Sequence, residues 1–123
     1  MRVLLDTHVL IWWDAGQKLS AAALEAIQHA DDVYVSVASA WEIAIKASLG
    51  KISSKRSVSQ ATAECGFLEL PVTFEHAELV ATLPSIHRDP FDRMLVGQAI
   101  VEGLTVVTRD PAIRQYHVSV IAA

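Results

Sequence analysis

Cysteine is almost missing from this sequence of 123 residues, which contains only Cys65. A single cysteine excludes an intramolecular disulfide, and the sequence has no Cys-x-x-Cys pair or cysteine–histidine cluster of the kind that binds zinc. So few thiols are typical of proteins from a reducing compartment. We therefore expect a fold that is stabilised by its core and not by cross-links.

Long hydrophobic runs are also missing. The apolar stretch at the N-terminus is interrupted by Asp6, far short of the roughly 20 apolar residues that span a bilayer. It lacks the small-residue cleavage site of a secretory signal as well. These absences predict a soluble protein of the cytoplasm with no membrane partner.

Positive charge is in deficit, because 10 lysines and arginines stand against 14 acidic residues and give a formal net charge of −4. Proteins that bind nucleic acid usually present a basic surface, so the total argues at first against such a partner. The basic residues nevertheless gather in two groups, one in an acid-free stretch and one flanking the acids discussed below: Lys46, Lys51, Lys55 and Arg56, and then Arg88, Arg93, Arg109 and Arg114. A solvated surface and a nucleic-acid contact both remain open.

Hydrophobic residues make up 52% of the sequence, enough for one domain with a well-filled core over residues 1–123. Short apolar runs alternate with helical patterns, and 53–59 is expected to be a loop. Strands are expected at 2–6, 33–36, 67–70, 104–108 and 118–121. Helices are expected through Trp13, from Ser20 to about Ala30, from Ser36 or Ser39 to Gly50, at 58–65 and 75–83, and from Pro90 toward Gly103. A short helix is expected after Asp110 and Pro111, which repeat the signal of a cap followed by proline. This alternation predicts an α/β fold with a mainly parallel sheet and helices on both faces.

The stretch from His87 to Ala99 predicts the most buried of these helices. Asp89 is a natural N-cap, because it precedes Pro90 and proline suits the first helical position. The helix that follows is apolar on almost every side. Asp92 is therefore unusual, since it places a carboxylate in the first turn of a helix that seeks the interior. It either balances the helix dipole or has a chemical role.

Three further acids are expected near Asp92. The carboxyl ends of parallel strands face a common crevice, where Asp6 and Asp110 follow two of the expected strands, and Glu42 lies early in a helix. Each acid also has a structural explanation. Asp6 and Asp110 could cap helices, and Glu42 could complete a capping box with Ser39 or pair with a lysine four residues on.

Four carboxylates on one rim repel one another unless cations compensate them. Oxygen ligands without soft donors suit magnesium, and two such ions can activate water and stabilise the departing oxygen in phosphodiester hydrolysis. Without these four acids the formal net charge of −4 would be zero. A protein whose four site acids are compensated by bound cations would therefore not repel nucleic acid.

Four segments carry a family resemblance: MRVLLDTHVLIWW, SVASAWEIAIKASLGK, LPSIHRDPFDRMLVGQA and GLTVVTRD. In this order they resemble the acidic motifs of PIN-domain proteins, specifically the VapC-type toxins of bacterial toxin–antitoxin pairs. The resemblance implies a three-layer α/β/α PIN fold, an endoribonuclease that depends on Mg²⁺ or Mn²⁺, inhibition by a cognate antitoxin, and homodimers.

The resemblance also assigns residues. Asp6, Glu42 and Asp92 match the three main metal-site acids, and Asp110 matches a fourth whose role varies in the family. Thr7 and Thr108 would be supporting polar groups that orient carboxylates or waters. Asp89 is either a cap or a further supporting acid.

Other residues have two interpretations each. Lys46 either pairs with Glu42 or contacts the RNA backbone. His8 and His87 could orient a phosphate or bridge acids, or could be structural. The remaining candidates for contact with RNA, each of which can also be structural, are Arg93, Arg109, Trp12, Trp13 and Trp41.

Two competing functions remain. One is a catalytically inactive interaction module on the same fold. The other is a phosphatase with an aspartate after the first strand, although residue 8 is histidine where a haloacid-type phosphatase has its second aspartate.

Overall fold

Five short apolar runs form one sheet in the computed structural model, which describes residues 1–53 and 56–123. The strands are β1 (Arg2–Leu5), β2 (Asp32–Ser36), β3 (Leu68–Leu70), β4 (Thr105–Thr108) and β5 (Val120–Ala122). Their order in the sheet is β3-β2-β1-β4-β5, and all four pairings are parallel. The predicted mainly parallel sheet is confirmed, with β1 at its centre.

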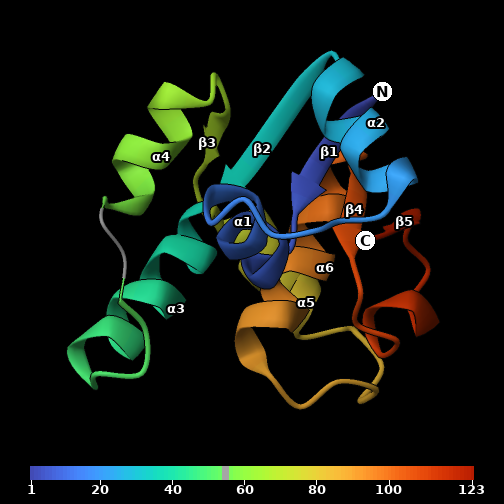
Figure 1. Ribbon diagram of the computed structural model, residues 1–123. Helices are drawn as coiled ribbons and strands as arrows, with labels where there is room; N and C mark the ends of the chain where they lie inside the picture. The colour runs from blue at the N-terminus through green and yellow to red at the C-terminus, as the bar shows by residue number, and fades with distance from the viewer. Residues whose placement is uncertain (54–55) are drawn as a thin grey trace.

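Helices cover both faces of the sheet. On one face Val3 and Leu5 of β1 pack beneath α1 (Thr7–Asp14) and α2 (Ala21–His29), whereas Leu4 points to the opposite face, toward α6 (Pro90–Glu102). Helix α5 (Phe74–Val80) packs against α6 (Figure 1). The period-2 alternation of β1 therefore builds two hydrophobic cores, one on each side of the sheet, and the predicted α/β/α layers are confirmed.

Local capping decides where most helices begin. Ser20 caps α2 by accepting a hydrogen bond from the amide of Ala23, and Ser57 forms a capping box with Gln60 at the start of α4 (Val58–Glu64). Asp89 caps α6 through the amide of Phe91, as predicted. The expected loop at 53–59 is wrong at its end, because this capping box already starts α4 at Val58. Residues 54 and 55, which include Lys55, lie outside the described residues.

Helix α3 (Val37–Ser48) begins at the earlier of its two possible caps. Ser36, the last residue of β2, accepts a hydrogen bond from the amide of Ala38, so Ser39 lies inside the helix. The capping box between Ser39 and Glu42 is therefore wrong. The Ser39 hydroxyl instead accepts a hydrogen bond from Thr7 Oγ1 at 2.7 Å, which links α3 to α1.

The last part of the chain returns from α6 into the sheet at Gly103, whose φ of 68° lies in the left-handed region that favours glycine. Asp110 accepts a hydrogen bond from the amide of Ala112, but only a single 3-10 turn, η1 (Ile113–Gln115), follows where a short helix was expected.

Among the described residues no helix is long and apolar enough to cross a membrane.

Candidate metal and nuclease site

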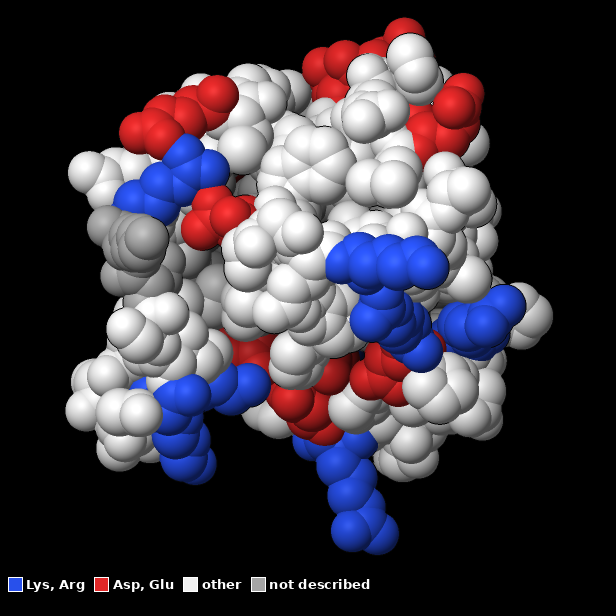
Figure 2. All heavy atoms as spheres, viewed as in Figure 1, with Lys and Arg blue, Asp and Glu red and all other residues white. Residues whose placement is uncertain are grey.

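The predicted acids gather at the carboxyl edge of the sheet. Asp6 directly follows β1, and Asp110 lies two residues beyond β4, the neighbour of β1. Glu42 comes from α3 and Asp92 from the first turn of α6. Figure 2 shows acidic side chains clustered at the edge toward which the strands of Figure 1 run, with basic side chains on either side.

Asp6 is buried, with 3% of its surface exposed. Thr108 Oγ1 donates a 2.6 Å hydrogen bond to Asp6 Oδ2, whereas Asp6 Oδ1 is buried without a hydrogen-bond partner among the described residues. Although Asp6 occupies the N-cap position of α1, its side chain makes no capping hydrogen bond, so its interpretation as a helix cap is wrong. Burial raises the pKa of Asp6, against the lowering effect of the Thr108 hydrogen bond.

Glu42 is equally buried, with 2% exposed. Lys46 Nζ lies 2.8 Å from Glu42 Oε2, so the predicted pairing along the helix is present. Glu42 Oε1 has no partner among the described residues. The hydrogen bond to Glu42 and the charges of Glu42, Asp89 and Asp92 raise the pKa of Lys46, against a lowering by burial, so the ammonium group faces several carboxylates at once.

Asp92 connects the acids electrostatically. Burial is the main cause that raises its pKa to about 7, and the charges of Asp6, Asp89 and Glu42 act in the same direction. A carboxylate responds in this way only to charges that lie close to it in a poorly solvated site. The charges of Asp6 and Glu42 therefore act on Asp92 at this edge of the sheet, and Asp89 adds charge from its position as the cap of α6. That these acids are metal ligands stays a prediction.

His87 joins the site by a contact that the sequence left open. Its Nε2 lies 2.6 Å from Asp110 Oδ2 and 3.0 Å from Asp92 Oδ2, while Nδ1 accepts a hydrogen bond from the amide of Asp89. Partial burial lowers the pKa of His87, but the hydrogen bond to Asp110 and the charges of Asp92 and Asp110 raise it overall. In the sequence, the feature that pointed to a role for His87 at the site was its position in the segment LPSIHRDPFDRMLVGQA, two residues before the cap Asp89.

Asp110 is held on both carboxylate oxygens, by His87 and by the amide of Ala112. Burial raises its pKa, but these hydrogen bonds outweigh burial and leave the pKa below its ordinary value. Thr108 supports both acids, since its Oγ1 donates to Asp6 and accepts from the amide of Asp110. Thr7 contacts Ser39 and not a carboxylate.

The candidate RNA-contacting arginines have structural contacts. Arg93 donates to the carbonyl oxygens of Val80, Leu83 and Pro84 and so holds the segment before α6. Arg109 donates to the carbonyl oxygen of Lys18 and lies over the ring of Trp12.

The residues of this site fit a hard divalent cation. Asp6 Oδ1 and Glu42 Oε1 are buried acceptors that lack donors, and every acid that converges on them offers oxygen ligands. Among the described residues, His87, Asp92 and Asp110 form a group whose ligand atoms all lie within 4.8 Å of one another. The carboxylates suit magnesium or manganese, whereas the imidazole of His87 also suits zinc or iron.

Comparison with known proteins identifies the family. The family model described as PIN domain matches residues 3–118 of the chain. The chain belongs to the PIN domain family. Ribonuclease VapC22 of Mycobacterium tuberculosis (strain ATCC 25618 / H37Rv) is 34% identical to it, over 93% of this chain and 91% of the relative. The resemblance to VapC-type members of the PIN family is thereby confirmed.

Solved structures share this PIN fold. A chain in the structure of VapBC2 from Rickettsia felis bound to a promoter DNA fragment superposes with a TM-score of 0.71 at 14% identity and covers 99% of this chain and 98% of its own. A chain in the FitAcB structure from Neisseria gonorrhoeae has a TM-score of 0.63 at 21% identity and covers 98% and 96%. At these identities the likeness concerns the fold alone.

Proposed function

We propose that this PIN-domain protein is a toxin endoribonuclease that hydrolyses RNA phosphodiester bonds with Mg²⁺ or Mn²⁺ and is inhibited by a cognate antitoxin. The observation that carries the proposal is the pair of buried carboxylate oxygens without donors, Asp6 Oδ1 and Glu42 Oε1, on two acids whose charges both act on Asp92. The 34% identity to a protein named a ribonuclease supports the choice of RNA as the substrate.

In this proposal Asp6, Glu42 and Asp92 hold the cation. When bound, the cation would supply Lewis acidity that favours attack by water and stabilises charge on the departing oxygen. Thr108 fixes the orientation of Asp6 through Oδ2 and leaves Oδ1 free to act as a ligand. Asp92, with its pKa of about 7, has to lose its proton to act as a ligand near neutral pH.

Two basic side chains are proposed to face the RNA. Lys46 keeps 34% of its side chain exposed beside Glu42, which suits contact with a phosphate at the site. Arg109 is exposed next to Asp110. Arg93 is left out of this role, because carbonyl oxygens of the chain already occupy its guanidinium.

The cleavage experiment tests the proposal directly. We expect the purified protein to cleave single-stranded RNA with Mg²⁺ or Mn²⁺ and to be inactive in excess chelator. Asp6→Asn should abolish most cleavage, whereas the matched control Asp31→Asn removes the same charge at an exposed position outside the site and should keep it. Cleavage that persists in chelator would exclude the metal mechanism. A well-folded wild type without any nuclease activity would favour the inactive interaction module.

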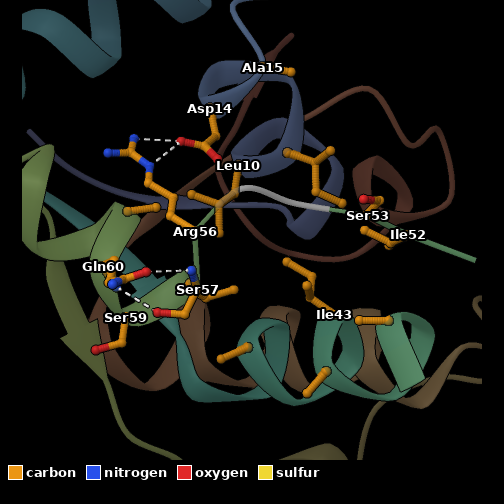
Figure 3. A pocket seen from close by; sticks show the side chains of 16 residues that line it. Leu10, Asp14, Ala15, Ile43, Ile52, Ser53, Arg56, Ser57, Ser59 and Gln60 are labelled. Atoms are coloured by element: carbon orange, nitrogen blue, oxygen red, sulfur yellow. Dashed lines mark hydrogen bonds and ion pairs between the residues drawn. The ribbon is translucent and has the colours of Figure 1, made fainter. Parts of the chain in front are cut away.

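A cleft of ≈ 980 Å³ is proposed to receive the antitoxin. It lies between α1, α3 and α4, and its apolar lining includes Leu10, Ile43 and Val58. Figure 3 shows Leu10 and Ile43 on facing sides of the cleft, with the ion pair between Asp14 and Arg56 beside Leu10. An amphipathic segment fits such a surface. Co-expression with the product of an adjacent small gene should give a complex that no longer cleaves RNA, and a complex with unchanged cleavage would contradict this role.

A second copy of the chain is proposed as a further partner. Four exposed apolar residues repeat every fourth position along α3 and form one stripe: Val37, Trp41, Ile45 and Leu49. Such a stripe is the kind of surface that an interface covers. Sedimentation should show a dimer that Leu49→Glu dissociates, and a wild type that is monomeric at assay concentrations would contradict this assignment.

An RNA substrate is consistent with the predicted cytoplasmic location.

A further inference from the structure

Three flat side chains form a stack beside the acidic site. The guanidinium carbon of Arg109 lies 4.1 Å from the centroid of the Trp12 ring, and the imidazole of His8 lies 5.9 Å from the same ring at an interplanar angle of 35°. His8 and Trp12 are four residues apart on α1 and so share one face of the helix. We refer to these residues as the His8–Trp12–Arg109 stack.

The stack is attached rigidly to the proposed ligands. Helix α1, which carries His8 and Trp12, begins immediately after Asp6. Arg109 lies between Thr108, which binds Asp6, and Asp110. Its Nη2 donates to the carbonyl oxygen of Lys18 at 2.7 Å, which holds the guanidinium over the indole.

Exposure distinguishes this stack from ordinary core packing. His8 and Arg109 are exposed, and only Trp12 is half-buried against the core beneath the sheet. The hydrogen bonds and ion pairs of the site acids use none of the three side chains, although the charge of His8 acts to lower the pKa of Asp6. Exposed aromatic rings combined with a planar cation are the means by which proteins bind unpaired bases, because every base has a face that stacks.

We propose that the His8–Trp12–Arg109 stack binds a nucleobase of single-stranded RNA, next to the phosphodiester bond at the acids. This inference rests on the proposed ribonuclease function and adds the part of the substrate that it contacts. A base has to leave a duplex to stack on these side chains, so the site selects single strands. Trp41 is the competing platform, since 64% of it is exposed, but its contact with Phe91 is edge-on and includes no cation.

A cycle that combines protein variants with altered RNA tests the inference. Binding of labelled single-stranded RNA is measured by fluorescence anisotropy in excess chelator at low ionic strength. Each RNA is compared with forms in which one nucleotide beside the mapped cleavage position is abasic. The variants are Trp12→Leu, His8→Ala and Arg109→Lys, with Phe74→Leu, at an exposed aromatic position on α5, as the matched control and Trp41→Leu as the test of the competing platform. Arg109→Lys keeps the charge and loses the planar group. His8 and Arg109 are exposed, so their variants should fold and can still test the inference if Trp12→Leu does not fold.

One abasic position should weaken binding to the wild type about tenfold. The stack variants should bind the intact RNA about as weakly and should respond little to that abasic substitution. Phe74→Leu should behave like the wild type, and Trp41→Leu should keep the full response to the abasic substitution. Equal sensitivity to abasic positions in all variants, an effect of Trp41→Leu alone, or no binding of RNA by the wild type would overturn the inference. Cleavage in Mg²⁺ is assayed in parallel and tests the proposed function separately. If the wild type cleaves RNA but the stack variants respond to the abasic substitution as the wild type does, the role of the stack is wrong and the nuclease function stands.

Discussion

At the scale of single residues, the site is defined by which carboxylate oxygens have partners. Asp110 has both oxygens engaged, whereas Asp6 and Glu42 each have one engaged and one buried without a donor. A buried carboxylate oxygen without a hydrogen-bond donor destabilises the folded protein. Such an oxygen is tolerated where a bound ligand supplies the missing interaction. The unengaged oxygens therefore support the proposal that Asp6 and Glu42 are ligands more directly than their charge alone.

Asp92 should make the stability of the metal-free protein decrease with pH. Its pKa of about 7 lies above the value of about 4 expected in the unfolded chain, so the native state binds more protons between these values. The free energy of unfolding should therefore fall as pH rises from about 4 to about 7, on the order of 2 kcal/mol after allowance for solvent screening. The raised pKa of His87 acts in the same direction as pH rises further. Urea unfolding in chelator at several pH values measures this slope.

Asp92→Asn is the matched variant, because it keeps the shape of the side chain and removes the titrating group. Its unfolding free energy should exceed that of the wild type at pH 7 and change less with pH. If the wild type and Asp92→Asn had parallel pH profiles, the raised pKa of Asp92 would not be the cause.

The residues that follow strands or open helices could be predicted from the sequence, because strand order and caps place them locally. Asp6 and Asp92 are of this kind, whereas Glu42 lies in the second turn of α3. Of the interpretations of His87, the bridging of acids is confirmed by its contacts with Asp92 and Asp110. The contacts of Arg93 with distant carbonyl oxygens could not be predicted, since they depend on the path of the segment before α6. The hydroxyl of Thr7 contacts Ser39 and no carboxylate, so the role of Thr7 as a support for the acids remains a prediction.

At the scale of elements, the position of Asp92 depends on how closely α6 approaches α5. A Cβ added at Gly97, in the middle of α6, would lie 2.7 Å from Val80 Cγ2 of α5. Gly97→Ala should gain about 1 kcal/mol of helix propensity but lose more through the clash, because the branched side chain of Val80 moves little. We expect a net loss of roughly 1 kcal/mol in the free energy of unfolding, measured with denaturant.

The clash can be separated from other effects of the alanine by a second change. Val80→Ala removes Cγ2, so Gly97→Ala made in that background should be neutral or stabilising. Additive effects of the two substitutions would contradict the close approach of α5 and α6 at this point.

Element types were easier to predict than their ends. Helix α6 and strand β4 are confirmed almost to the residue, because Asp89, Pro90 and Gly103 mark the helix and a β-branched run marks the strand. The last strand begins two residues later than expected, at Val120, and a single 3-10 turn takes the place of the helix expected after Pro111. The cleft between α1, α3 and α4 could not be predicted, because it forms only when three helices distant in sequence pack together.

At the scale of the whole molecule, metal binding and folding stability are linked. The four site acids account for the formal net charge of −4, so they repel one another in the metal-free protein. A cation that binds only the native state adds RT ln(1 + [L]/Kd), about 2.7 kcal/mol at a hundredfold excess over Kd. The stability of the entire domain therefore reports whether a given acid is a ligand.

Asp6→Asn should reverse its rank with the wild type when magnesium is added. In chelator we expect it to be as stable as the wild type or more so, because it removes a buried charge and its amide oxygen can still accept the hydrogen bond from Thr108. With Mg²⁺ the melting temperature of the wild type should rise well above that of Asp6→Asn, which loses a ligand. Thermal melts with chelator and with Mg²⁺ measure both states.

Asp6→Ala completes this comparison, because it removes the acceptor as well as the charge. In chelator it should lose roughly 1–3 kcal/mol relative to Asp6→Asn, since the hydroxyl of Thr108 is left buried without its partner. Its melting temperature should respond to Mg²⁺ as little as that of Asp6→Asn. A structural role for Asp6 alone predicts instead the same Mg²⁺-induced shift in all three proteins, and that result would exclude Asp6 as a metal ligand.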